Sequence, residues 1–117
     1  MSNKSLVKKN LYILFISELN ISKIGISRNV KKRLSQLQTG CPYEIKIIKV
    51  YESELSSKIE KILHRQFRTR KIDSSEYNLV GEWFNLDIDT ILKFNDICDE
   101  IEKNILYLRE KENPFIK

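Results

Sequence analysis

The chain has few of the residues that build metal clusters and disulfide frameworks. Its 117 residues include only two cysteines, Cys41 and Cys98, and a single histidine, His64. Cysteines this far apart, without C-x-x-C spacing, favour free thiols in a reducing compartment. The same shortage leaves too few ligands for a structural zinc site. We therefore expect neither disulfides nor structural zinc to stabilise the fold.

The sequence also lacks the long apolar segments that cross a membrane. No apolar run approaches the roughly 18 to 20 residues of a membrane span. The start of the chain, MSNKSLVKKN, has no apolar core like that of a secretory signal. We expect a cytoplasmic protein with no membrane partner. Walker-type loops, dinucleotide-binding glycine fingerprints and serine-nucleophile elbows are missing as well, which argues against those enzyme classes.

Charge is unevenly distributed along the chain. Hydrophobic residues make up 41% and charged residues 32%, which is typical of a globular protein, and the length fits one domain over residues 1–117. Residues 1–71 hold 16 lysines and arginines against 5 glutamates, a net of +11. Residues 72–117 hold 5 against 11 acidic residues, a net of −6. This distribution indicates one surface for a polyanion and another kept away from it.

Hydrophobic periodicity predicts an α/β (α+β) protein. Short runs rich in branched and aromatic residues are typical of strands, and the brief connection ELN between the first two favours an antiparallel hairpin. Longer segments with apolar residues three and four apart are typical of amphipathic helices. The expected elements are strands at 10–17 and 21–27, a helix at about 29–38 capped by Ser27 or Asn29, a strand at 43–52, a helix at about 53–70, an extended piece at 82–86 and a long helix at about 87–112 capped by Asp87 or Asp89.

The second strand carries a charged residue inside an apolar sequence, KIGIS at 23–27. Because side chains alternate along a strand, Ile24 and Ile26 share one face while Lys23 and Gly25 share the other. Gly25 removes a side chain beside the lysine and lets another backbone or a ligand approach closely. Lys23 therefore has two interpretations: a solvated charge on an edge strand, or part of a phosphate-handling site.

Four polar residues could carry chemistry at the margin of the core. Glu60 and His64 are four apart on the second helix, so they could hold one hard divalent cation and a proton acceptor, or could be an incidental pair. Arg33 offers a planar fork for phosphate oxygens, or belongs to a solvated basic face. Tyr12 could present a phenol to a cleft or serve only as core. The candidate DNA-backbone patch, which could equally be solubilising charge, consists of Arg28, Lys31, Lys32, Arg65, Arg68 and Arg70.

In order and spacing, these residues resemble the GIY-YIG nuclease superfamily. The resemblance is closer to its small bacteriophage-type branch, which has KIG, E-x-x-x-H-x-x-F and E-W-F motifs. Ten residues separate Tyr12 from Lys23, and Arg33 follows Lys23 by ten. The matching motifs, in chain order, are LYI at 11–13, KIG at 23–25, Arg33, EKILHRQF at 60–67 and GEWFNL at 81–86.

The resemblance implies a three-stranded antiparallel sheet flanked by helices. It also implies hydrolysis of phosphodiester bonds in DNA with one divalent cation, Mg²⁺ or Mn²⁺. By that resemblance Glu60 binds the metal, and Arg33 holds the phosphate oxygens as negative charge accumulates. Tyr12 positions or deprotonates the attacking water, and His64 shares in proton transfer. Lys23 stands in the place of the second motif tyrosine, where its charge would favour ionised Tyr12.

The chain departs from the superfamily pattern in several places. Asn10 replaces the glycine of the first motif, and lysine replaces the tyrosine of the second. The late asparagine of the superfamily has only Asn78 and Asn85 as candidates. These departures leave the general base open between Tyr12 and His64.

The E-W-F motif has a structural and a chemical interpretation. Trp83 and Phe84 are large apolar residues that we expect to anchor the final helix, while Glu82 caps or bridges locally. The alternative places Glu82 close to the metal as a further acidic group.

The favoured function is a metal-dependent DNA endonuclease or nickase. Its intrinsic sequence specificity is expected to be low, set by DNA structure or supplied by a protein partner. The alternative is a catalytically inactive nucleic-acid-binding module that keeps the fold. A protein-binding scaffold is a third possibility, favoured only by the acidic section. We expect a monomer, or a homodimer formed through the C-terminal helix.

Overall fold

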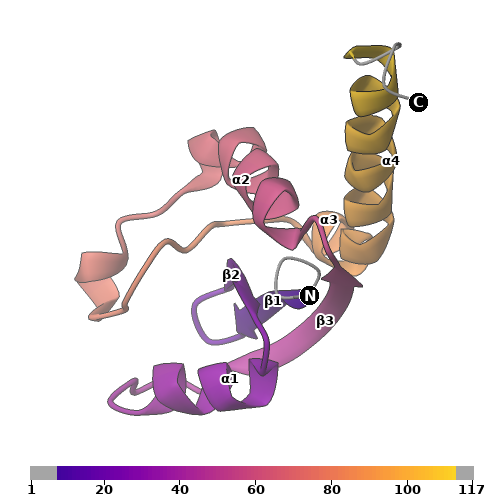
Figure 1. Ribbon diagram of the computed structural model, residues 1–117. Helices are drawn as coiled ribbons and strands as arrows, with labels where there is room; N and C mark the ends of the chain where they lie inside the picture. The colour runs from indigo at the N-terminus through magenta and orange to yellow at the C-terminus, as the bar shows by residue number, and fades with distance from the viewer. Residues whose placement is uncertain (1–7, 113–117) are drawn as a thin grey trace.

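The computed structural model describes residues 8–112, and its centre is a three-stranded antiparallel sheet (Figure 1). β1 (Lys9–Ile16) is the middle strand and pairs with β2 (Ile21–Ser27) on one side and β3 (Lys46–Ser53) on the other. β1 and β2 form the expected hairpin, with the turn between them at residues 17–20. The predicted α+β fold is confirmed.

Helices cover both faces of the sheet. α1 (Val30–Gln38) packs on one face. α2 (Ser56–Gln66), α3 (Ile88–Leu92) and the first part of α4 (Phe94–Glu112) pack on the other (Figure 1). The sheet therefore divides the core into two apolar clusters, which we call the α1 cluster and the α2 cluster. Burial of apolar surface in both is the main stabilising contribution.

β1 is buried on both faces because it is the central strand. Leu11 and Ile13 belong to the α2 cluster, whereas Tyr12 and Leu14 belong to the α1 cluster. All four side chains are almost completely buried. A strand covered on both sides is a continuous apolar run, which explains why LYILFI contains no charged residue.

α1 begins at the residue that its cap predicts. The Asn29 side chain accepts a hydrogen bond from the Lys32 backbone N–H at 3.0 Å, so Asn29 rather than Ser27 is the N-cap. The inward side of the helix rests on the α1 cluster through Val30, Leu34 and Leu37.

β3 begins later than the predicted strand at 43–52. The Gln38 side chain at the end of α1 donates to the Tyr43 carbonyl at 2.8 Å and accepts from the Ile45 N–H at 2.9 Å. These bonds hold the start of the predicted strand against α1. Pairing with β1 therefore starts only at Lys46.

α2 is shorter than the predicted helix at 53–70. The Ser53 hydroxyl accepts a hydrogen bond from the Leu55 N–H at 2.9 Å and sets a turn before the helix begins. At the other end, Phe67 leaves helical geometry and a 3-10 turn, Arg68–Arg70, follows. Two of the arginines expected on the helix therefore lie on a turn beyond it. The apolar residues of this region that pack in the α2 cluster are Leu55, Ile59, Ile62, Leu63 and Phe67.

The E-W-F segment pairs with the outer edge of β2 through an antiparallel bridge. The backbone of Phe84 donates to Ser22 at 2.7 Å and accepts from it at 2.8 Å. Phe84 lies in the α2 cluster with residues of α3 and α4, so it anchors the C-terminal helices as predicted. Trp83 lies in the α1 cluster instead, so that part of the prediction is wrong. Consecutive side chains of an extended segment face opposite sides, which is why the two aromatics separate.

The predicted final helix consists of two helices. Asp87 rather than Asp89 caps α3, by accepting a hydrogen bond from the Thr90 N–H at 3.2 Å. Lys93, with φ −93° and ψ 11°, separates α3 from α4. The far part of α4 extends past the sheet (Figure 1).

Two expectations about the whole chain can be compared with the described residues. Cys41 and Cys98 are free, as predicted. Cys98 is fully buried, which raises the pKa of its thiol to about 12. Between residues 8 and 112 there is no helix of the length and apolarity needed to cross a membrane.

Candidate active site

The ring of Tyr12 covers the face of β2 that carries Gly25. Tyr12 and Gly25 are directly opposite each other in the pairing of β1 with β2. A Cβ atom at residue 25 would collide with the hydroxyl and with Cζ of Tyr12. The close approach that Gly25 permits is therefore made by the phenol of the neighbouring strand, not by a ligand. The glycine lets the ring extend from β1 across β2.

Lys23 is buried rather than solvated. Only 8% of its surface is exposed, and its ammonium lies 5.8 Å from the centre of the Trp83 ring. The ammonium also lies against Gly81, where a Cβ atom would collide with it and where φ is +87°. The charge is thus held over an aromatic face in a cation–π contact. The interpretation of Lys23 as a solvated edge-strand charge is wrong.

Tyr12, Lys23, Arg33 and Glu60 form one electrostatic cluster, which we call the β2 cluster. Burial raises the pKa of the Tyr12 phenol, a hydrogen bond and charge from Arg33 oppose the rise, and the Glu60 charge adds to it. Burial and the charge of Arg33 lower the pKa of the Lys23 ammonium. The charges of Glu60 and Glu82 oppose that shift. Side chains from β1, β2, α1 and α2 thus act on one another.

The structure does not support the predicted ionisation of Tyr12 by Lys23. The pKa of the phenol is raised, because the cost of burying a phenolate outweighs the effect of the nearby cation. That cation is Arg33 rather than Lys23. Tyr12 is therefore protonated at neutral pH and can donate a hydrogen bond to a water or to a phosphate oxygen.

Arg33 and Glu60 are the more accessible members of the β2 cluster. Arg33 is half-buried, and its Nη1 donates to Gln36 Oε1 at the long distance of 3.5 Å. The Glu60 side chain is 25% exposed, and its carboxylate lies 3.9 Å from His64 Nε2. A guanidinium and a carboxylate are thus available to a ligand that approaches from solvent.

Glu60 is the residue that could hold a divalent cation. Among residues 8–112, no group of three or more His, Cys, Asp or Glu side chains is arranged to hold a metal ion. A Mg²⁺ ion still fits this environment, because Mg²⁺ usually keeps several waters and binds through one or two carboxylates plus substrate phosphates. The chain's contribution would then be the Glu60 carboxylate.

Both ring nitrogens of His64 make short contacts. Nδ1 lies 2.9 Å from Glu82 Oε1, and Nε2 lies 2.8 Å from the backbone oxygen of Ile24. Both oxygens are acceptors, so both contacts are hydrogen bonds only if the ring donates from each nitrogen. The ring also packs edge-on against Phe84, with centroids 5.2 Å apart. Both ring nitrogens thus face oxygen atoms of the chain, and the role of His64 in proton transfer stays a prediction.

Glu82 bridges locally, in agreement with the structural interpretation of the E-W-F motif. Besides its bond from His64, it accepts a hydrogen bond from Lys71 Nζ at 3.2 Å. These two bonds lower the pKa of the Glu82 carboxyl. The sequence did not predict the contact of Lys23 with Trp83 and Gly81. The only nearby feature of the sequence that could have indicated it is the glycine directly before the E-W-F motif.

The predicted DNA-contacting residues are all exposed, on two segments that adjoin the β2 cluster. One segment is the short connection before α1 together with the start of that helix, which carries Arg33. The other is the end of α2 and the turn after it, beyond Glu60. The exposed side chains are Arg28, Lys31 and Lys32 in the first segment and Arg65, Arg68 and Arg70 in the second.

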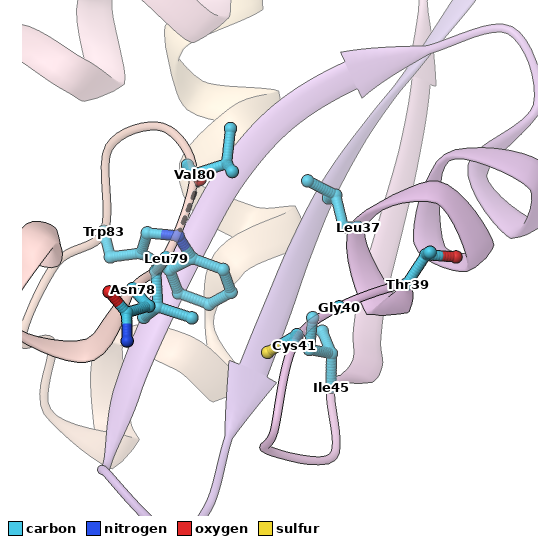
Figure 2. A pocket seen from close by; sticks show the side chains of 9 residues that line it. All are labelled: Leu37, Thr39, Gly40, Cys41, Ile45, Asn78, Leu79, Val80 and Trp83. Carbon is cyan, nitrogen blue, oxygen red and sulfur yellow. Dashed lines mark hydrogen bonds between the residues drawn. The ribbon is translucent and has the colours of Figure 1, made fainter.

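A separate small hollow lies between the end of α1 and the loop that precedes Trp83 (Figure 2). The hollow encloses about 70 Å³. Trp83 lines it and also contacts Lys23, but no residue of the β2 cluster itself lines it. The Trp83 indole N–H donates to the Val80 carbonyl at 3.0 Å. Asn78 lines this hollow, with φ +57° at the end of a 3-10 turn. Asn85 is exposed, and its N–H donates to the Arg70 carbonyl at 2.8 Å. Local turn and backbone roles account for both candidates for the late asparagine.

Comparison with known proteins identifies one family. The sequence pattern of the T5orf172 domain matches residues 10–101, a range that contains β2, β3, all of β1 except Lys9, and the whole β2 cluster. The T5orf172 domain is a phage-associated domain related to homing-endonuclease and GIY-YIG-like nucleases. No curated protein and no solved structure matches the chain.

Proposed function

The chain belongs to the T5orf172 domain family, and we propose that it is a metal-dependent DNA endonuclease or nickase of the GIY-YIG type. The observation that carries this proposal is the convergence of Tyr12, Lys23, Arg33 and Glu60 from four elements around β2. A phosphodiester is an anion that repels hydroxide. A catalyst therefore needs cations near the phosphate and a group that orients the water. The β2 cluster offers both.

In the proposed reaction, water adds to phosphorus and one P–O ester bond breaks, which leaves a phosphate monoester and a hydroxyl group. Arg33 binds the non-bridging oxygens, where its permanent charge stabilises the negative charge that develops. Tyr12 donates from its protonated phenol and orients the water or a phosphate oxygen. Lys23 adds positive potential from its buried position behind them.

Glu60 would hold the Mg²⁺ or Mn²⁺ ion. When bound, the ion would supply Lewis-acid activation and neutralise charge on the phosphate. The exposed arginines and lysines beside the β2 cluster would hold the DNA backbone without reading bases. Sequence specificity would be low, set by DNA structure or supplied by a protein partner. We propose a cytoplasmic enzyme that acts as a monomer or as a homodimer through α4.

A DNA-binding module without catalysis is the second candidate. Two observations favour it: His64 makes contacts with acceptors through both nitrogens, and burial raises the pKa of Tyr12. The Tyr12 phenol is thus protonated at neutral pH, and both nitrogens of His64 already face oxygen atoms of the chain. The intact arrangement of Arg33 and Glu60 favours the nuclease, because a chain that only binds backbone phosphates does not need a half-buried carboxylate next to them.

A cleavage assay separates the two candidates. The purified protein is incubated with supercoiled and with single-stranded DNA in Mg²⁺, Mn²⁺ or EDTA. We expect nicked or linear products with either metal and none with EDTA. Glu60→Ala and Arg33→Ala should each slow cleavage by on the order of 100-fold or more. The matched control is Lys93→Ala, at the exposed junction of α3 and α4, which should cleave normally.

DNA that shifts on a gel but stays uncut under every condition would support the binding module and end the nuclease proposal. Cleavage that survives Glu60→Ala undiminished would instead show that the metal ligand is elsewhere.

A further inference from the structure

We propose that His64 and Glu82 are positioning residues, which hold Glu60 and Lys23 in place around β2. This inference rests on the proposed nuclease function and assigns a task to two residues whose side chains lie beside the β2 cluster. Its support is a continuous set of hydrogen bonds that joins α2, the edge of β2 and the segment 81–84.

The first hydrogen bond places a side chain of α2 on the backbone of β2. The backbone groups of Ser22 and Ile24 point to the same outer edge, because they alternate along a strand. Phe84 pairs with Ser22 there through its own backbone. The Nε2 of His64 takes the next acceptor on that edge, the Ile24 carbonyl, at 2.8 Å. α2 is therefore fixed directly to the residue that follows Lys23.

The second hydrogen bond fixes the segment that contacts Lys23. The Nδ1 of the same ring contacts Glu82 at 2.9 Å, and Lys71 holds the other carboxylate oxygen at 3.2 Å. The residues on either side of Glu82 both touch the buried lysine. Gly81 lies against the ammonium, and Trp83 presents its ring to it. A displaced Glu82 would therefore move both residues that surround the Lys23 charge.

The position of Glu60 depends on the same ring. Glu60 and His64 are one turn apart on α2, and the carboxylate lies 3.9 Å from Nε2. Any rotation of α2 that moves His64 away from β2 would also move Glu60 away from Tyr12 and Lys23. Partners that orient a metal ligand typically contribute about tenfold to a hundredfold in metal affinity or activity.

Two substitutions separate the two hydrogen bonds. In His64→Gln, the amide can replace the Nε2 donor toward Ile24. In His64→Asn, the amide can replace the Nδ1 donor toward Glu82. We expect His64→Gln to bind Mn²⁺ within about threefold of wild type and His64→Asn to bind at least about tenfold more weakly. Paramagnetic broadening of backbone NMR signals around Glu60 measures this binding without any cleavage, and melting temperatures confirm that both variants fold.

Kinetics give a second measurement of the same variants. We expect kcat at a fixed Mn²⁺ concentration to fall in the order wild type, His64→Gln, His64→Asn, while KM for DNA stays constant. The reason is that the hydrogen bonds orient Glu60 and Lys23 and do not touch the DNA backbone. A purely structural role would lower the melting temperature without this order.

The single histidine makes the ring itself observable. Because the sequence contains only His64, ring N–H signals in ¹⁵N-labelled protein without an added histidine tag belong to that residue. We expect the ring N–H that donates to the Ile24 carbonyl to be protected from exchange with solvent. Equal Mn²⁺ affinity in wild type, His64→Gln and His64→Asn would overturn the positioning role.

A control and the wild type complete the test. Tyr51→Phe removes a hydrogen bond between β3 and α4 and should change neither Mn²⁺ affinity nor cleavage. A wild type that binds Mn²⁺ but does not cut DNA ends the nuclease proposal alone, because the His64 variants still decide positioning by Mn²⁺ binding. A wild type that binds no Mn²⁺ would overturn the positioning role as well.

Discussion

Tyr12 and Tyr51 lie on neighbouring strands of one sheet, and their electrostatic surroundings are opposite. Burial raises the pKa of both phenols. The Arg33 guanidinium opposes the rise at Tyr12, whereas the Glu102 carboxylate adds to it at Tyr51. The Tyr51 hydroxyl donates to Glu102 at 3.0 Å, a bond that attaches α4 to β3. One tyrosine attaches a helix to the sheet, and the other lies buried between charges of both signs.

The same contrast separates two larger parts of the molecule. Residues 1–71 carry a net charge of +11, and residues 72–117 carry −6. The sheet, α1 and α2 come from the basic part, and α3 and α4 come from the acidic part. In the proposed function, a DNA molecule would be attracted by the first and repelled by the second, which would favour one orientation before any contact forms. The acidic side chains of α4 that accept hydrogen bonds from β3 are Asp99 and Glu102.

Replacing each of the two phenols by phenylalanine gives the largest expected contrast. Tyr12→Phe removes the hydroxyl beside Arg33 and should slow DNA cleavage by on the order of 100-fold. Tyr51→Phe should leave cleavage unchanged but lower the free energy of unfolding by about 1 kcal/mol, because the hydrogen bond to Glu102 is removed. Initial cleavage rates and urea unfolding measure the two quantities. Equal cleavage rates in both variants would remove Tyr12 from the reaction.

Features with a local cause could be predicted from the sequence. The alternation of β2 placed Lys23 and Gly25 on one face, and the structure has them there. Asn29 caps α1, because a short polar side chain before an amphipathic run satisfies free N–H groups. Glu60 and His64 lie on one side of α2, because residues four apart are neighbours on a helix.

Contacts between distant segments could not be predicted in the same way. A periodic pattern indicates which face a side chain occupies, but not which distant residue it meets or which rotamer it adopts there. The sequence therefore did not show that Tyr12 fills the space over Gly25 or that Trp83 turns to Lys23. Nor did it show that both nitrogens of His64 face acceptor atoms. One of these acceptors is a backbone oxygen, and every residue type carries the same backbone oxygen.

Lys23 gives the second contrast, because its charge and its buried stem can be removed separately. Lys23→Met keeps an apolar chain beside Trp83, and Lys23→Ala does not. We expect both variants to cleave DNA about tenfold more slowly, because the charge near the phosphate is absent. Only Lys23→Ala should lower the free energy of unfolding by about 2 kcal/mol, because it leaves a cavity. Rates and urea unfolding check these expectations.

The matched control for Lys23 is a lysine on the opposite edge of the sheet. Lys46 in β3 is exposed and lies 4.0 Å from Glu44. Lys46→Met should change neither cleavage nor stability appreciably, since exposed ion pairs contribute little. If Lys23→Met cleaves as fast as Lys46→Met, the buried lysine has a structural role only.

The smallest expected effect concerns DNA affinity and compares equal changes of charge in the two parts of the molecule. One variant replaces Arg65, Arg68 and Arg70 by glutamine, and the other replaces Lys93, Lys103 and Lys111. The first should bind duplex DNA several-fold more weakly. Its plot of log affinity against log salt should be shallower by about 0.9 for each phosphate that the protein no longer neutralises. Fluorescence anisotropy at several salt concentrations measures both quantities.

The lysine variant should bind DNA nearly as wild type does, with an unchanged salt slope. Two of its lysines already pair with carboxylates four residues earlier in the chain, Lys93 with Asp89 and Lys103 with Asp99, each at 3.2 Å. Both variants remove the same formal charge, so a general attraction between DNA and a basic protein would weaken both equally. Equal decreases in affinity would therefore show that net charge, rather than the surface beside the β2 cluster, holds the DNA.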